Sequence, residues 1–482
     1  MSTPAQSNLT LVRGLTLIAA ASIVIGNVVG TGVFLKARVM TCNVGTPDMV
    51  IAVWVAAGVL SLAGALTYAE LAAMMPRAGG EYVFVREAYG PRWGFLYGWM
   101  QIFIAKTGSQ AAVAVALAIF LNDLTGGTLR ATLFTQNIFG YEFSVTTLQL
   151  IALVAIAVVT VINCAAVAVS GWVATVLTAV KIALVLGVGL GAFLLANGDW
   201  GHFALANAGG ACEGVSAAAQ FGVAGFGAAM LGALWGYDGW NNLTLVAGEV
   251  KNPQRNIPLA LIGGTILIIL LYVFINIAYF YVLTPTEIAS VSPDSSVARE
   301  VGLRFFGAGV ISLMSAALMA SSFGTLHSSI LTGARVPYAM ARDQLFFQNL
   351  SRLSRSTRVP VGALVVQGIW AGILTLSGSF DTLTNYVIFG SWIFYGLPTA
   401  SVFLFRRRMP HAERPYKAWG YPVVPVLFLL VTAFLLINTL LTTPVQALIG
   451  LGLIALGLPV YWYFSRRGMV SINRENLYND KD

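Results

Sequence analysis

Long apolar runs alternate with short polar connections along this chain. A helix needs about 20 apolar residues to cross about 30 Å of hydrocarbon, because each residue adds about 1.5 Å. Backbone amides find no water in lipid, so such runs must be helical, and the strict alternation of a barrel strand is absent. We therefore predict an all-α membrane protein with twelve transmembrane helices. They span Gly14–Phe34, Met49–Met75, Phe95–Leu121, Val145–Cys164, Ser170–Leu195, Ala217–Ala247, Pro258–Leu283, Val310–Ala334, Val361–Ser377, Tyr386–Phe405, Val423–Leu441 and Val445–Phe464.

Composition agrees with this pattern and excludes several other classes. Of the 482 residues, 57% are hydrophobic and only 10% are charged, which is too apolar for a soluble enzyme of this size. The net charge of +8 does not suggest nucleic acid, because the basic residues lie between the apolar runs. The three cysteines have no metal-binding spacing. We expect no metal, no cofactor and no nucleic-acid partner.

The basic residues also predict the orientation in the cell membrane. With both termini cytoplasmic, most of the 27 Lys and Arg residues fall on the inside, and few fall in the outside loops. The start of the first run is similar to a signal-peptide core, but the run continues past it, so we expect it to be retained. The sequence predicts a multi-pass protein with both termini in the cytoplasm.

Two of the predicted spans contain residues that weaken a helix. The first span has three glycines between Gly26 and Gly32, and the sixth has glycines, an acid and two amides between Trp235 and Asn242. Close helix packing explains the first stretch as well as a binding site does, but packing does not require Asp238. Paired interruptions at corresponding positions are typical of transporters built from two inverted halves. We predict one transporter domain over residues 1–482, with repeats at 13–196 and 217–405 and two further helices within 423–464.

The backbone of such interruptions favours one kind of ligand. A half-helix that begins after Gly30 presents free N–H groups and a partial positive charge, which suit a carboxylate, and the Thr31 hydroxyl adds a donor. The broken ends before Gly30 and around Trp235 to Asp238 expose carbonyls, which suit an ammonium group. The simplest ligand with both groups is an α-amino acid.

Four stretches resemble the APC superfamily of amino acid permeases, in particular its L-type amino acid transporter (LAT) branch. This resemblance implies a LeuT-type fold of five plus five inverted helices with two additional C-terminal helices, and transport by alternating access. The stretches are GNVVGTGVF from Gly26, YAELAAMMPRAGGEYVFVREAYG from Tyr68, ALWGYDGWNNLTLVAGEVKNPQRNIP from Ala233 and FGTLHSSILTGARVPYAMARDQ from Phe323.

The resemblance also implies roles for single residues. It assigns contacts with the α-amino and α-carboxylate groups to Val28, Thr31 and Gly32, beside the helix start at Gly30. It assigns Trp235 as an aromatic lid, which leaves room for small or medium substrates. In the same stretch, Asp238 contributes a backbone carbonyl, with or without its side chain, and Asn241 is a polar residue beside the pocket.

Buried cations need an explanation, because a charge inside the membrane costs at least about 2.5 kcal/mol. Lys181 could reach carbonyls or headgroups. The resemblance instead implies that its ammonium replaces a sodium ion between helices 1, 5 and 8, and proton coupling stays open. We predict sodium independence. We expect Lys106 to have a packing role and His327 to be a hydrogen-bonded buried histidine.

The loops give further expectations. Three acids and three arginines lie at the end of the second predicted span or soon after it and form either an ion-pair cluster or a solvated loop. They are Glu70, Glu81, Glu87, Arg77, Arg86 and Arg92. After the sixth span, Gly248-Glu249 replaces the two adjacent acids common in the family. Cys42 and Cys212 both fall in predicted outside loops, and the sequence does not show whether they pair. The loop 122–144 lacks the cysteine through which animal members join a heavy chain, so we expect no disulfide-linked partner.

Together these features predict a secondary transporter that moves neutral L-amino acids by sodium-independent exchange or facilitated transport. The alternative is a cationic or proton-coupled amino acid transporter. A Walker motif is absent, which excludes an ATP-driven step in this chain. Hydrolase motifs and paired carboxylates are absent as well, so we do not expect an enzyme. Few charged residues lie in the spans, which argues against a channel.

Overall fold

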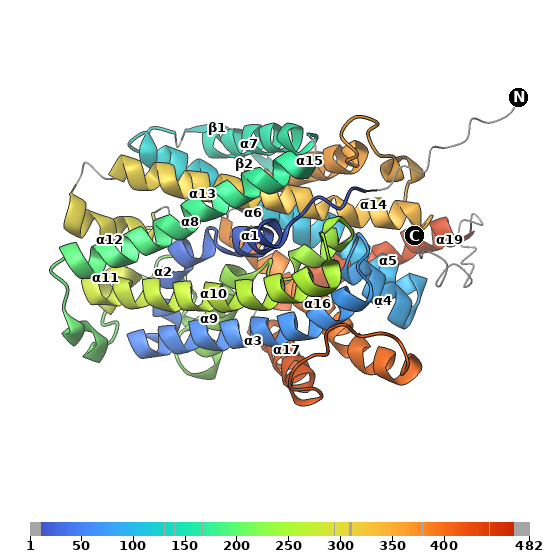
Figure 1. The fold of residues 1–482 in the computed structure, drawn as a ribbon. Helices are drawn as coiled ribbons and strands as arrows, with labels where there is room; N and C mark the ends of the chain where they lie inside the picture. The colour runs from blue at the N-terminus through green and yellow to red at the C-terminus, as the bar shows by residue number, and fades with distance from the viewer. Residues whose placement is uncertain are drawn as a thin grey trace, which may run out of the picture.

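The fold is described from a computed structural model that covers residues 11–129, 131–138, 141–165, 167–293, 295–307, 311–376, 380–442 and 444–466. It is almost entirely helical, and its long helices run side by side (Figure 1). The helices are α1 Leu17–Val28, α2 Gly32–Val44, α3 Pro47–Met74, α4 Glu81–Tyr89, α5 Pro91–Met100, η1 Gln101–Ala105, α6 Lys106–Leu124, α7 Thr147–Asn163, α8 Val167–Leu195, η2 Trp200–Ala204, η3 Ala217–Ala219, α9 Gly222–Tyr237, η4 Asn242–Glu249, α10 Pro253–Val282, α11 Pro285–Ala289, α12 Val297–Phe306, α13 Ile311–Gly333, α14 Arg335–Arg342, η6 Gln348–Ser351, α15 Val361–Thr375, α16 Phe380–Arg408, α17 Val423–Thr442, α18 Pro444–Ala455 and α19 Gly457–Arg466.

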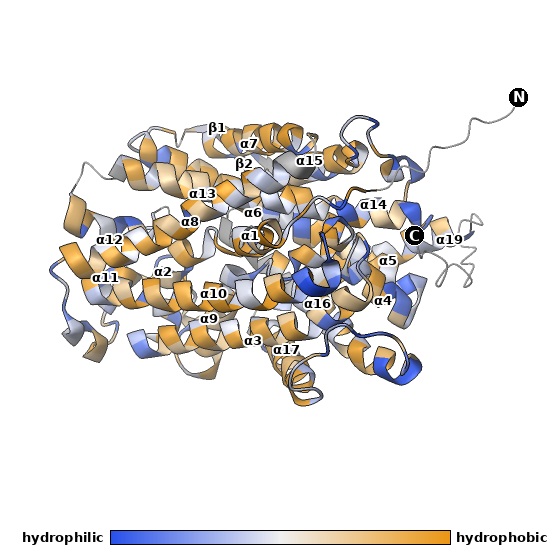
Figure 2. Ribbon diagram, viewed as in Figure 1, coloured by the Kyte–Doolittle hydropathy of each residue, from blue (hydrophilic) through white to orange (hydrophobic). Residues whose placement is uncertain are grey.

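Seven helical segments of the described chain are long and apolar enough to cross a membrane. Figure 2 shows their apolar residues along the length of the bundle. The shorter helices α7 and α15 are also apolar. All twelve predicted runs are helical over most of their described length. The seven segments are Leu17–Val44, Pro47–Met74, Pro91–Leu124, Ser170–Leu195, Pro253–Val282, Val423–Leu441 and Ala447–Arg466.

The first span is longer than the sequence predicts. It continues past Phe34 as α2, so Lys36 and Arg38 lie in a helix and not in a loop. Both side chains are buried, and Arg38 Nη1 donates to the Glu213 carbonyl at 2.8 Å. Arg38 is accommodated in this helix because the chain before α9 supplies the Glu213 carbonyl as its acceptor.

A two-stranded sheet is the other feature that the sequence pattern missed. Strands β1 Thr132–Ile138 and β2 Tyr141–Thr146 pair antiparallel within the segment expected to be a loop. The hairpin leads directly into α7, whose first turn is fixed by a capping box between Thr146 and Gln149.

The end of α2 is tied to the chain that precedes α9. Cys42 forms a disulfide with Cys212, with their Cα atoms 5.7 Å apart. Beside it, the Phe221 amide donates to the Asn43 carbonyl at 2.6 Å, and Asn43 Nδ2 donates to the Ala219 carbonyl at 2.6 Å. The pairing that the sequence left open is therefore present.

At the opposite end of the bundle, which carries α4 and α14, the chain before α1 meets the end of η4. The Leu15 amide donates to the Glu249 carbonyl at 2.9 Å, and the Lys251 amide donates to the Leu15 carbonyl at 2.8 Å. Another backbone bond joins the Gly79 amide to the Leu245 carbonyl at 2.9 Å. We call this the α4 end, and these contacts close it around the sixth span.

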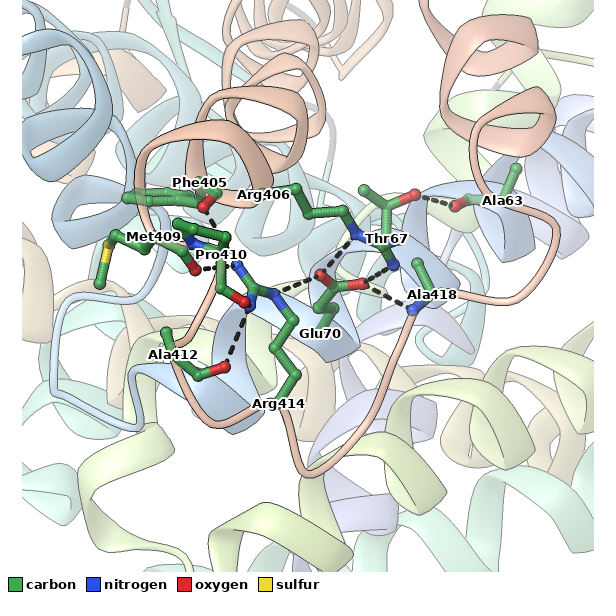
Figure 3. A network of polar contacts seen from close by, with 10 residues as sticks. All are labelled: Ala63, Thr67, Glu70, Phe405, Arg406, Met409, Pro410, Ala412, Arg414 and Ala418. Carbon is green, nitrogen blue, oxygen red and sulfur yellow. Dashed lines mark hydrogen bonds and ion pairs between the residues drawn. The ribbon is translucent and has the colours of Figure 1, made fainter.

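The acids of the α4 end pair differently from the predicted cluster. Arg86 contacts Glu87, as the cluster required, and also Asp343. Glu70 instead binds Arg406 in the last turn of α16, with two bonds of 2.7 and 3.0 Å, and Arg414 after that helix, at 3.3 Å. Figure 3 shows Glu70 at the centre of this network, where it also accepts the Ala418 amide at 2.7 Å.

Neither of the two alternatives, a local ion-pair cluster or a solvated loop, describes Glu70. The end of α16 and the segment after it bring Arg406 and Arg414 to a carboxylate on α3 that is only 2% exposed. Glu81 also differs from the expectation, because its described partners are uncharged side chains.

Candidate functional site

Both predicted interruptions are present. The first span stops at Val28 and resumes at Gly32, and Val29 between them has non-helical angles. The sixth span leaves the α-helix after Tyr237 and resumes as the 3₁₀-helix η4. In this second gap, Gly239 has φ +100°, a backbone conformation that strongly favours glycine.

The two interruptions lie against each other. A Cβ added at Gly32 would lie well under 3.0 Å from Gly236 Cα, so the two backbones touch. The Tyr272 hydroxyl lies 2.8 Å from the carbonyl oxygens of both Val28 and Gly236. A hydroxyl has one hydrogen and donates to one of them at a time. Tyr272 on α10 thus joins both broken ends.

The start of α2 lies at this contact and is shielded from solvent. Thr31 makes no side-chain cap bond at the start of α2, and the first amides of a helix have no partner within it. The end of α9 lies beside them, because Gly32 contacts Gly236. Thr31 and Trp235 are 2% and 6% exposed, so the region is shielded from solvent.

Gly30 is also placed by close packing. A Cβ at this position would lie 2.7 Å from Thr325 Oγ1 on α13, which is closer than real Cβ atoms come. The glycine therefore lets the interruption of the first span approach α13.

The polar residues of the sixth-span interruption bind other side chains. Asp238 Oδ1 accepts the Tyr395 hydroxyl at 2.7 Å. Asn241 Nδ2 donates to Glu81 Oε1 at 2.6 Å and is fully buried. Both amino acids thus help to hold the interruption in place, and a role of either in substrate contact stays a prediction.

Lys181 connects three helices. Its Nζ donates to the Gly26 carbonyl and to Thr325 Oγ1, both at 2.6 Å, and its side chain is fully buried on α8. The ammonium therefore lies between α1, α8 and α13, next to the first interruption. A carbonyl and a hydroxyl oxygen are also ligands that suit a hard cation.

The other buried cation and the histidine have partners of their own. Lys106 donates to Asn242 Oδ1, which agrees with the packing role expected for it. Asn163 Nδ2 lies 3.1 Å from His327 Nδ1, so the histidine is hydrogen-bonded as predicted. Within the described residues, no group of three or more His, Cys, Asp or Glu side chains could hold a metal ion.

Sequence reasoning missed three residues around the interruptions: Tyr272, Thr325 and Tyr395. A single tyrosine in an apolar span gives no signal of its contacts. Thr325 does lie within the stretch from Phe323 that carries the resemblance, so the motif could have pointed to it.

Comparison with known proteins matches this architecture to a family. Residues 15–463 match the amino acid permease family. The chain is 33% identical over 459 residues to the serine/threonine exchanger SteT of Bacillus subtilis, covering 95% of this chain and 98% of SteT. It is 31% identical over 438 residues to the human b(0,+)-type amino acid transporter 1, covering 90% and 84%. It is 29% identical over 474 residues to the large neutral amino acids transporter small subunit 2 of Rattus norvegicus, covering 98% and 83%.

These matches confirm the resemblance to LAT-type transporters and exclude an enzyme. The chain belongs to the amino acid permease family and is a multi-pass membrane protein that transports amino acids.

Proposed function

We propose that this protein moves neutral L-amino acids across the membrane by alternating access, as a sodium-independent exchanger or facilitated transporter. The proposal includes twelve spans in a LeuT-type arrangement, with repeats at 13–196 and 217–405, two helices within 423–464 and both termini in the cytoplasm. The observation that carries it is the contact between the interruptions at Gly32 and Gly236. The first amides of α2 have no partner within their helix and lie beside the end of α9 in a shielded place, which supports binding of the carboxylate of an α-amino acid.

The substrate contacts are proposed on the same basis. The amides that begin α2 at Gly30, Thr31 and Gly32 would bind the carboxylate, and carbonyls near Val28 and Asp238 would bind the ammonium group. Trp235 would cover the side chain, and Asn241 would hold the second interruption. Counterflow in proteoliposomes against all twenty amino acids tests the proposal, because only substrates drive uptake of label. Absence of counterflow with every amino acid would contradict it.

The choice of neutral substrates rests on Asp238. Its carboxylate is engaged by the Tyr395 hydroxyl at 2.7 Å, which leaves it less available for a cationic side chain. The names of two relatives, an exchanger of serine and threonine and a transporter of large neutral amino acids, agree with this choice. If unlabelled arginine competes with labelled alanine as strongly as alanine does, the substrate is cationic instead.

We expect Asp238→Asn to keep neutral amino acid transport within about threefold of the wild type. The amide oxygen of Asn still accepts the Tyr395 hydroxyl, so the change removes a charge at a loss of roughly 1 kcal/mol or less. Initial rates of alanine exchange measure the effect. A loss of alanine transport above tenfold would show that the charge itself takes part.

Sodium independence rests on Lys181, whose ammonium binds Gly26 and Thr325. We expect replacement of Na⁺ by choline to leave exchange unchanged. We expect Lys181→Met to abolish exchange at any sodium concentration, because it removes the ammonium that holds α1 and α13 together beside the first interruption. Exchange that stops in choline would contradict the assignment.

We also propose that the protein needs no disulfide-linked heavy chain. Cys42 and Cys212 are bonded to each other, and Cys164 is the remaining cysteine of the chain. The segment 122–144 contains no cysteine for such a bond.

A further inference from the structure

Glu81 is a buried carboxylate whose described hydrogen-bond partners come from two different spans. It begins α4, between the second and third predicted spans, and its side chain is inaccessible to solvent. Oε1 accepts Asn241 Nδ2 at 2.6 Å, and Oε2 accepts the Tyr97 hydroxyl at 2.8 Å. A buried carboxylate is costly unless it is hydrogen-bonded, so these two contacts hold the side chain in one position.

Both partners lie at irregular parts of their helices. Asn241 is in the interruption of the sixth span, directly before η4. Tyr97 is on α5, and its hydroxyl accepts Gln101 Nε2 at 2.6 Å. Gln101 opens the π-helical turn η1, and such turns occur often at functional sites.

A second contact from the third span reaches the adjacent residue of the interruption. Lys106, the first residue after η1, donates to Asn242 Oδ1. Neighbouring amides of the sixth span are therefore held by a carboxylate of α4 and an ammonium of α6. These contacts join the closed α4 end to the proposed substrate region.

We propose that Glu81 is a positioning residue for the transport cycle: its ionised carboxylate, acting through Asn241, holds the second half of the sixth span in the closed position, and its protonation loosens that hold. This inference rests on the proposed function. A protonated carboxyl must donate its own hydrogen, so it no longer accepts both bonds with full strength.

The burial of Glu81 favours its protonated form. Burial raises the pKa of this carboxyl above its ordinary 4.5, while the bonds from Tyr97 and Asn241 and the charge of Lys106 oppose the rise. The other titratable groups that face it are the phenols of Tyr68 and Tyr395. The Lys106 ammonium attracts the carboxylates of both Asp238 and Glu81.

The test is the pH dependence of exchange in proteoliposomes. We expect the maximal rate of the wild type to rise at least threefold as the pH falls from 7.5 to 5.5, with less than a twofold change in KM. Glu81→Gln should be insensitive to pH and show the higher rate throughout. Glu81→Asp, which keeps a titrating group, should restore the rise.

A matched control is Glu87→Gln, which makes the same change on the same helix at a residue paired with Arg86. It should keep the response of the wild type. A flat wild-type profile, or a Glu81→Gln variant that keeps the response, overturns the inference. If the wild type exchanges no amino acid at any pH, the proposed function fails instead.

Discussion

Gly32→Ala is expected to reduce amino acid exchange by about 100-fold or more, because displacement of reacting or binding groups by about 1 Å has effects of that size. The new Cβ would lie well under 3.0 Å from Gly236 Cα and 3.0 Å from the Gly236 amide nitrogen. Both atoms belong to the backbone, so no side chain can rotate away. The first turn of α2 must shift, and the proposed carboxylate contacts shift with it. Initial rates of alanine counterflow measure the loss.

The protein should still fold, because overpacking of this kind costs about 1–3 kcal/mol. Gly263→Ala on α10 is the matched control. A Cβ there meets no heavy atom within 4 Å, so exchange should be unchanged. If Gly32→Ala retains a third or more of the wild-type rate, the interruptions do not form the site.

The largest expected effect on stability follows from removing Arg335. Its guanidinium binds Glu249 with two bonds, Nε to Oε1 at 2.8 Å and Nη2 to Oε2 at 3.0 Å, and neither side chain is exposed. Arg335→Gln leaves the carboxylate buried without its cation, which costs about 3–5 kcal/mol. We expect a marked loss of folded protein, measured by thermal unfolding in detergent.

Two further variants test whether the loss of stability comes from the unpaired buried charge. Arg304→Gln breaks the ion pair between Arg304 and Glu287, whose side chains are 54% and 43% exposed. This change should alter the free energy of unfolding by about 1 kcal/mol or less. Arg335→Met combined with Glu249→Leu removes both charges and should recover much of the loss. An Arg335→Gln variant as stable as the wild type would contradict the buried ion pair.

The interruptions could be predicted because their signal is local. Glycines and polar residues in the middle of an apolar run disfavour a continuous helix wherever the chain folds. The same holds for the twelve predicted runs, whose length and apolar composition are visible in the sequence itself. Gly32 and Trp235 were found in this way.

The partners of those residues could not be predicted, because each lies far along the chain. Nothing near Tyr272 indicates that its hydroxyl reaches Val28. The acids of the α4 end show the same limit, because Glu70 binds Arg406 and Arg414 in place of nearby arginines. Arg38 looked like a loop residue because its acceptor, the Glu213 carbonyl, comes from the chain before α9.

The bond between Cys42 and Cys212 constrains how the bundle can rearrange. It fastens the far end of the first span to the segment that leads into the sixth, and the two contacts of Asn43 reinforce it. A covalent link cannot lengthen by several ångströms, so these parts cannot swing apart independently. Any opening movement on that side must therefore move α2 and the chain before α9 together.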